Sequence, residues 1–268
     1  MDIYPMKLSI ITINLNNKDG LRKTIESVVS QTFSDYEYIV IDGASTDESV
    51  EVIKEYKDKI TYWISEPDKG IYNAMNKGIL QAKGEYCLFL NSGDCMYQHT
   101  TLQDSFRDIN TDIVYGNVVV TVDGKEEERG GISKSDITLF DIMFGVIFHQ
   151  ASFIRTNLFF EIGLYSENYK IVSDWRFFLQ CTIKDNISFK YIDQSITRYE
   201  LSGVSSTDGY LMMNEKEKVR LELIPKSIFS DYQMLNKYRG SRLINIYDKL
   251  LKNKSILKIY NLIFHGKL

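Results

Sequence analysis

The chain has 268 residues, a formal net charge of −4, and 44% hydrophobic against 25% charged residues. This composition excludes an intrinsically disordered chain, and the length fits one large α/β domain or two smaller ones. The three cysteines, Cys87, Cys95 and Cys181, lack CxxC spacing, which favours buried thiols in a reducing compartment. No apolar run approaches the about 18 residues of a membrane span, and no signal peptide is recognised. We therefore expect a soluble, cytoplasmic protein.

The first 115 residues alternate predicted strands with predicted helices. Each strand is a short apolar run rich in β-branched residues, and each helix repeats apolar residues at helical spacing. The strands fall at 8–13, 38–41, 60–64 and 86–90, and the helices at 21–29, 50–56 and 71–80. Strands that are apolar on both faces and separated by helices indicate a Rossmann-like, mostly parallel sheet with helices on both faces.

Polar residues follow each of these four strands. They form clusters at 14–16, 42–47, 66–70 and 91–94. In parallel sheets of this kind the ligand binds beyond the carboxyl ends of the strands. Four successive strands that deliver acids and amides to one edge therefore predict a ligand site there.

The second half of the chain has a mixed pattern that extends the same sheet. Asp123-Gly124 predicts a hairpin turn, and Trp175 opens a short helix. A helical segment follows from Met212 and is interrupted by Pro225. The predicted strands of this half are 113–115, 118–122, 148–154 and 187–192.

Several of these segments resemble a known family when they are taken together. Residues 9–14, 30–33, 41–47 and 90–94 read SIITIN, SQTF, IDGASTD and LNSGD, in an order that resembles glycosyltransferase family 2. Residues 66–78, EPDKGIYNAMNKG, resemble the branch that builds bacterial exopolysaccharide, capsule and O-antigen. The resemblance covers residues 1–210.

The resemblance implies a GT-A fold with a nucleotide-binding half at 1–115 and an acceptor half at 116–210, followed by a basic helical segment at 211–268. It implies an inverting glycosyltransferase that takes a nucleotide-diphosphate sugar, with UDP as the expected nucleotide, and a divalent cation, Mg²⁺ or Mn²⁺. The expected acceptor is a hydroxyl of a glycan or of a polyprenyl-diphosphate-linked sugar.

Asp94 is the candidate metal ligand, because it ends an apolar strand and offers the hard oxygen that Mg²⁺ and Mn²⁺ prefer. Asn91 and Gly93 stand where the family often carries acids, so Asp94 is the only carboxylate of this run. The alternative is a strand-ending turn in which Gly93 has a positive φ.

Asp174 is the candidate general base, since it resembles the second acid of the family. A carboxylate within reach of the acceptor hydroxyl removes its proton during attack on the anomeric carbon. The alternative is a helix N-cap, because Ser173 and Asp174 precede the helical residues that begin at Trp175.

The nucleotide is expected to contact Asp42 together with Thr12 and Asn14, through hydrogen bonds to the base and ribose. Ser45 and Asp47 instead belong to a predicted capping box, residues 45–48, for the next helix.

Asp68 and Lys69 precede a helix whose N-terminus favours anions, so they are candidate donor contacts, with a turn anchored by Pro67 as the alternative. Asn76, one turn further, is expected to face the same pocket, and Ser92 is a further candidate contact.

His149 and Gln150 occupy an acceptor-side motif of the family, and we expect them to bind acceptor or diphosphate, with a structural histidine as the alternative. The small residues of 199–206 are typical either of a loop that closes over the donor or of an ordinary surface connection.

The C-terminal segment is strongly basic. From Lys226 onward the chain has nine Lys and Arg against two Asp, so the segment carries +7 and residues 1–225 carry −11 of the total −4. Apolar and basic residues alternate there at helical spacing, which favours either contact with an anionic membrane, as a peripheral protein on its inner face, or packing on the protein body or on a dimer partner. Nucleic-acid binding is not expected, because the body is acidic and lacks a recognition motif. The apolar residues at helical spacing in this basic C-terminal segment are Leu243, Tyr247, Leu250, Leu251, Leu257, Tyr260 and Phe264.

Two other functions remain open from the sequence. A sugar nucleotidyltransferase shares the sheet architecture but needs a Gly-rich loop with Arg after the first strand, which residues 14–18 do not provide. A nucleotide-sugar-binding protein without catalysis is compatible with the missing acids at Asn91 and Gly93.

Overall fold

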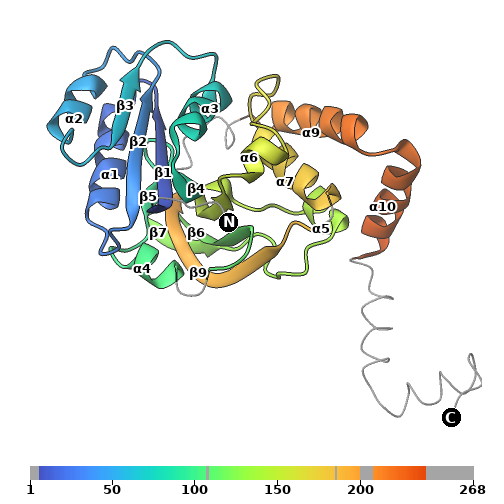
Figure 1. The fold of residues 1–268 in the computed structure, drawn as a ribbon. Coiled ribbons are helices and arrows are strands. Elements are labelled where there is room, and N and C mark those ends of the chain that lie inside the picture. The colour runs from blue at the N-terminus through green and yellow to red at the C-terminus, as the bar shows by residue number, and fades with distance from the viewer. Residues whose placement is uncertain (1–5, 107–108, 185, 200–207, 240–268) are drawn as a thin grey trace, which may run out of the picture. The chain divides into compact units, whose positions relative to one another are not determined.

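A computed structural model describes residues 6–106, 109–184, 186–199 and 208–239. The described strands form one nine-stranded sheet in the order β3-β2-β1-β4-β8-β6-β9-β5, with β7 paired to β6 (Figure 1). The parallel part consists of β1 (Met6–Asn14), β2 (Tyr36–Asp42), β3 (Tyr62–Ser65) and β4 (Gly84–Phe89).

Three helices connect these parallel strands. Figure 1 shows α1 and α2 on one side of the sheet and α3 on the other. The strands β1, β2 and β4 are buried along almost their whole length, because helices cover both faces and leave no side for water. All four predicted strands and all three predicted helices of this half are confirmed. The helices are α1 (Lys18–Val29), α2 (Ser49–Glu55) and α3 (Ile71–Gln81).

The second half extends this sheet with mixed pairing. β8 (Ser152–Arg155) pairs antiparallel to both β4 and β6 (Ile113–Val122), and β6 pairs parallel to β9 (Phe189–Tyr199). β7 (Lys125–Arg129) forms the predicted hairpin with β6, and Asp123 and Gly124 both have positive φ. Sequence patterns did not indicate the two-residue strand β5 (Cys95–Met96) or the short helices α4 (Thr101–Ser105), α5 (Leu139–Phe144) and α6 (Leu158–Glu161).

Two strand predictions of this half need correction. The separate strands 113–115 and 118–122 are one strand, β6, in which the pairing with β9 shifts register around Asn117. The predicted strand 148–154 is extended only from Ser152, because His149–Ala151 form a 3-10 turn, η1. Apolar character alone does not separate a buried strand from a buried turn.

Helices complete the described chain. α7 (Ser173–Ile183) follows the loop after α6, and α9 (Gly209–Leu223) and α10 (Lys226–Arg239) flank Pro225 as predicted. The chain divides into two compact units, 1–217 and 218–268, so the first unit ends inside α9.

Two predictions lie outside the described residues. They are the loop at 199–206, of which only Tyr199 is described, and the amphipathic pattern from Leu243 to Phe264. Within the described helices, no segment has the length and hydropathy needed to cross a membrane.

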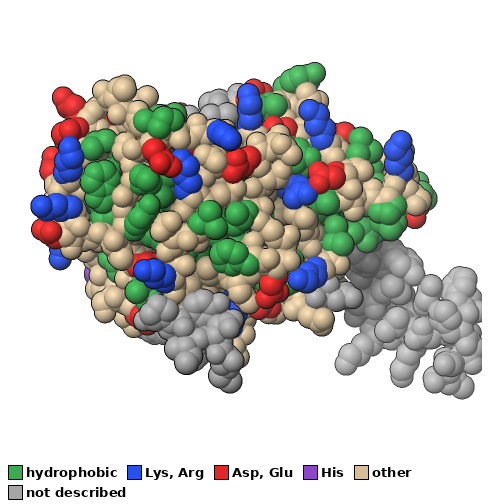
Figure 2. Space-filling view, turned by 45° about the horizontal axis from the view of Figure 1, so that its top comes forward, with side chains coloured by type: hydrophobic (Ala, Val, Ile, Leu, Met, Phe, Trp, Pro, Cys, Tyr) green, Lys and Arg blue, Asp and Glu red, His purple; other side chains and the backbone are tan. Residues whose placement is uncertain are grey.

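The surface carries both signs of charge side by side. Lys18 pairs with Glu48, and Arg22 pairs with Glu55, between exposed side chains of α1 and the α2 region. On the face in Figure 2, basic and acidic side chains are interspersed among separate hydrophobic patches. This pattern is typical of a solvated surface, on which single ion pairs contribute little to stability.

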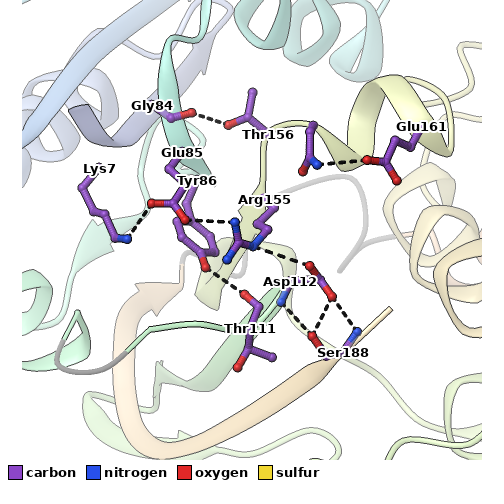
Figure 3. A network of polar contacts seen from close by, with 11 residues as sticks. Lys7, Gly84, Glu85, Tyr86, Thr111, Asp112, Arg155, Thr156, Glu161 and Ser188 are labelled. Carbon is purple, nitrogen blue, oxygen red and sulfur yellow. Dashed lines mark hydrogen bonds and ion pairs between the residues drawn. The ribbon is translucent and has the colours of Figure 1, made fainter. Parts of the chain in front are cut away.

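A polar network joins the strands at the edge where β1 and β4 begin (Figure 3). Arg155 pairs with Glu85 at 3.0 Å and with Asp112 at 3.5 Å, and its guanidinium lies 5.3 Å from the ring centre of Tyr86. Lys7 reaches the same Glu85 at 2.6 Å. The network links β1, β4, β8 and the start of β6, at the edge opposite the predicted ligand site.

Gly84 permits close contact between β4 and β1. A Cβ at this position would lie 2.5 Å from the carbonyl carbon of Leu8 and from the nitrogen of Ser9. Because backbone cannot yield like a flexible side chain, we expect Gly84→Ala to lower the free energy of unfolding by about 1–3 kcal/mol in urea denaturation. Gly209→Ala is the control, since a Cβ there meets no atom within 4 Å. Equal midpoints for both variants would contradict the prediction.

Candidate active site

The first strands bring the predicted polar residues to one edge of the sheet. Asn14 ends β1 and pairs in register with Asp42 at the end of β2. The Asn14 amide donates to the Asp42 carboxylate at 2.8 Å. Thr12, two residues earlier in β1, is buried and shares a hydrogen bond with the Tyr38 hydroxyl at 2.9 Å.

Asp42 is fully buried, and its carboxylate is saturated by protein donors. Oδ1 accepts from Asn14 Nδ2 and from Ser45 Oγ, and Oδ2 accepts from Ser45 N and from Ser65 Oγ. Four hydrogen bonds use the whole accepting capacity of a carboxylate. Asp42 therefore ties together the ends of β1, β2 and β3, and its predicted contact with the nucleotide stays a prediction.

The side-chain oxygen of Asn14 has no hydrogen-bond partner among the described residues. This atom, Oδ1, is buried. The bonds from Asn14 Nδ2 to Asp42 and Ser45 fix the orientation of this amide. Of the three predicted base and ribose contacts, Asn14 is the one whose geometry favours an outside partner.

The predicted capping box at residues 45–48 is wrong. α2 starts at Ser49, and its N-cap is Glu48, which has a φ of 67° and makes no side-chain capping bond. Ser45 is bound to Asp42 instead, and Asp47 accepts from the backbone nitrogens of Lys18 and Ser49. Residues 45–48 have the residue types of a capping box, but the hydroxyl of Ser45 donates to the buried Asp42 carboxylate and does not cap α2.

Asp68 folds back on the start of α3. It accepts from the nitrogen of Gly70 at 2.8 Å, and its Oδ2 would lie 2.5 Å from a Cβ at Gly43, so a side chain there would displace the Asp68 carboxylate. Lys69 is exposed, and its backbone nitrogen donates to Asn73. The side chain of Asp68 thus forms a local turn with Gly70. Donor contact by Asp68 and Lys69 and a turn anchored by Pro67 both stay predictions.

Asn76 holds another segment of the chain. Its amide donates to the carbonyl of Tyr165 at 2.8 Å and accepts from the nitrogen of Tyr165 at 3.0 Å. Nδ2 also lies 3.2 Å from a carboxylate oxygen of Glu167. Since these bonds occupy the side chain, Asn76 fixes the loop before α7, and its predicted donor contact stays a prediction.

A tight turn after β4 presents Asp94. Its nitrogen donates to the carbonyl of Asn91 at 2.9 Å, and Gly93 has a φ of 109°. Thr24 of α1 clamps the turn, because its hydroxyl donates to the carbonyl of Asp94 at 2.7 Å and accepts from the nitrogen of Gly93 at 2.9 Å. The Asp94 side chain is 3% exposed. The turn alternative therefore describes this backbone, and a buried carboxylate stands at its end.

The contacts of Ser92 and Gln150 do not indicate a ligand. The carbonyl of Ser92 accepts from the amide of Asn17 at 2.9 Å, and Gln150 is buried within η1. Their predicted binding roles stay predictions.

Asp174 lies at the meeting point of three distant segments. His149 Nδ1 is 3.0 Å from its Oδ2, and the Tyr72 hydroxyl is 2.8 Å from its Oδ1. The same hydroxyl is 2.6 Å from the carbonyl of Ile171, so its single proton is shared between two acceptors. The N-cap alternative is wrong, since the N-cap of α7 is Val172 and Asp174 stands inside the first turn.

His149 and Asp174 shift each other's pKa. Burial raises the pKa of Asp174, but the hydrogen bond and charge of His149, together with the bond from Tyr72, bring it below its ordinary value of 3.8. Burial lowers the pKa of His149, but Asp174 and, more weakly, Asp94 raise it above 6.5. Asp174 is therefore a carboxylate at neutral pH, the state that a general base requires.

The region of Asp94 fits a divalent cation only in part. Among the described residues, no group of three or more His, Cys, Asp or Glu is placed to hold a metal ion. Asp94 offers one hard oxygen ligand, and His149, which feels its charge, has a buried Nε2 that makes no hydrogen bond to the described chain. Such a donor set suits an ion that takes its other ligands from phosphate oxygens and water.

Sequence reasoning missed Tyr72 and Thr24. Tyr72 lies within the EPDKGIYNAMNKG segment, so the motif pointed to its neighbourhood but not to its partner, which is 102 residues away. Thr24 occupies a buried helical position, and nothing in its spacing signals a contact with the turn at 91–94.

The His149–Asp174 pair predicts a pH-dependent stability. Because the pKa of His149 is raised, its stabilising contribution is present at low pH and is lost as pH rises through the folded pKa. Because the pKa of Asp174 is lowered, its stabilising contribution is lost as pH falls through the folded pKa. His149→Asn removes the charge and keeps an amide donor. We expect it to lower the free energy of unfolding more at about pH 5.5 than at about pH 9, measured with EDTA present. A loss that is equal at both pH values would refute the ion pair.

Comparison with known proteins identifies the family. Residues 9–172 match the sequence model described as Glycosyl transferase family 2. The chain is also 32% identical over 207 residues to a PGL/p-HBAD biosynthesis glycosyltransferase of Mycobacterium bovis, covering 74% of this chain and 79% of the relative.

Solved structures show the same fold. Residues 1–349 of S. aureus TarS in complex with UDP-GlcNAc give a TM-score of 0.64 at 20% identity, over 89% of this chain and 74% of that one. The chain spans 46% of a longer TarS chain, at a TM-score of 0.65, 20% identity and 93% of its own length. The mannosyltransferase PcManGT of Pyrobaculum calidifontis, in complex with GDP-Man and Mn²⁺, gives 0.57 at 13% identity, over 95% and 83%. These likenesses confirm the predicted α/β, GT-A-like fold. The family match over residues 9–172 and the 32% identical relative show that the chain belongs to glycosyltransferase family 2.

Proposed function

We propose that this glycosyltransferase is an inverting enzyme that moves a sugar from a UDP-sugar to a hydroxyl of a cell-surface glycan or lipid-linked acceptor. The observation that carries the proposal is the partly buried, ionised carboxylate of Asp174, held by His149 and Tyr72. Membership of the family removes the nucleotidyltransferase alternative.

Asp174 acts as the general base. Its carboxylate accepts the proton of the acceptor hydroxyl while that oxygen forms a bond to the anomeric carbon. The bond between this carbon and the diphosphate oxygen breaks, its electron pair leaves with UDP, and attack from the opposite side inverts the configuration. His149 and Tyr72 restrict the rotation of the carboxylate, so the base meets the hydroxyl in one orientation.

The donor occupies the carboxyl edge of β1, β2 and β4. Asn14 is the candidate base or ribose contact because its Oδ1 lacks a protein partner among the described residues. The relation to TarS, which was solved with UDP and with UDP-GlcNAc, supports a UDP-sugar as donor.

A divalent cation is the proposed cofactor, and Asp94 is its proposed ligand. PcManGT, a structural neighbour, was solved with Mn²⁺. When bound, Mg²⁺ or Mn²⁺ neutralises charge on the diphosphate leaving group. The clamp from Thr24 keeps the Asp94 backbone fixed, which suits a ligand that must hold one position.

Replacement of the base tests the reaction. We expect Asp174→Asn to reduce sugar transfer about 10²- to 10⁴-fold, because an amide cannot accept the proton. The dissociation constant of UDP, measured by calorimetry, should stay within about twofold of the native value, since Asp174 does not bind the nucleotide. Transfer at the native rate would refute the assignment. No transfer by the native protein from any of a panel of UDP-sugars and acceptors would favour the alternative of a binding protein without catalysis.

The cation is tested by UDP binding. We expect Mn²⁺ to tighten UDP binding to the native protein at least about tenfold over binding in EDTA, and Asp94→Asn to abolish this difference. The matched control is UDP binding by the variant in EDTA, which should equal native binding under the same conditions. A variant that keeps the full effect of Mn²⁺ would rule out Asp94 as the ligand.

A further inference from the structure

The loop that leads to Asp174 has no strand or cap of its own to hold it. It runs from Gly163, which has a φ of 115°, to Val172, and the N-cap of α7 makes no side-chain capping bond. Side chains from other elements hold the loop instead. Asn76 of α3 binds both backbone groups of Tyr165.

The end of this loop is held by Glu215 of α9. The Glu215 carboxylate is 5% exposed, and its two oxygens accept from the nitrogens of Lys170 and Ile171 at 2.8 Å and 2.9 Å. Tyr72 occupies the other side, because its hydroxyl lies 2.6 Å from the carbonyl of Ile171 and 2.8 Å from Asp174. Both backbone groups of Ile171 are therefore fixed three residues before the base.

A second contact joins α9 to the start of α7. The ammonium of Lys216 lies 5.1 Å from the ring centre of Trp175, the residue directly after Asp174. The indole nitrogen of Trp175 donates to the carbonyl of Ile142 at 2.8 Å. The residues on both sides of Asp174 are thus placed by contacts from outside α7.

We propose that Glu215 is a positioning residue for Asp174 and acts through the backbone of Lys170 and Ile171. The inference rests on the proposed role of Asp174 as the base. It means that α9, which lies beyond the 9–172 match to the family, contributes to the reaction. A carboxylate suits the task because two N–H donors meet two accepting oxygens, whereas a glutamine offers only one.

The test is Glu215→Gln, assayed for sugar transfer and for UDP binding. We expect kcat to fall about 10- to 100-fold, since a small displacement of a catalytic group costs this much. The donor KM and the dissociation constant of UDP should change less than about twofold. Glu215→Asp, which keeps the charge and shortens the reach, should lose about tenfold in kcat, and it serves if the glutamine variant does not fold.

Two controls separate positioning from general damage. Glu37→Gln removes a carboxylate that is 2% exposed and accepts from Ser9 and from the nitrogen of Lys83, at the opposite edge of the sheet, so it should lose stability and keep kcat. In the Asp174→Asn background, Glu215→Gln should cause no further loss of kcat, because its effect passes through Asp174.

The outcomes are distinct. Native kcat in the Glu215 variants, or a loss that adds fully to that of Asp174→Asn, would overturn the positioning role. Native transfer by Asp174→Asn would overturn the proposed base, whatever the Glu215 variants do.

Discussion

The proposed site depends on how one partly buried carboxylate, Asp174, is kept charged. An ionised group away from water is stable only when it is paired and hydrogen-bonded. His149 supplies the charge and Tyr72 supplies the hydroxyl, and they come from η1 and α3, which belong to different halves of the sheet. The contacts of His149 and Tyr72 therefore couple the two halves of the chain, because Asp174 is held by one residue from each half.

The same physical rule separates residues that serve the fold from residues that are available to a ligand. Asp42 and Asn76 have the residue types of a binding site, yet protein donors and acceptors occupy their polar atoms. Asn14 and His149 each keep one buried atom without a hydrogen bond to the described residues. Since an unsatisfied buried polar atom costs free energy, these two atoms are candidates for contact with a ligand.

Much of the fold was predictable because its signals are local. The alternation of apolar strands and amphipathic helices predicted β1 to β4, and the polar residues after these strands lie together at one edge of the sheet. The capping box at 45–48 failed because a motif records residue types and not which buried carboxylate competes for a serine. Tyr72 and Glu215 could not be found, since their contacts with Asp174 and Ile171 span 102 and 44 residues and depend on packing between α3, α7 and α9.

Several carboxylates that make residues 1–225 acidic are paired within the protein. A surplus of carboxylates at the carboxyl edge would repel a diphosphate if they all faced it as free charges. Asp42 is surrounded by four donors, Asp47 accepts from Lys18 and Ser49, and Asp174 is paired with His149. The charges of these groups are thus compensated within the protein, and Asp94 is the carboxylate whose charge a cation is proposed to share with the donor. An edge rich in acids is in this way compatible with an anionic substrate.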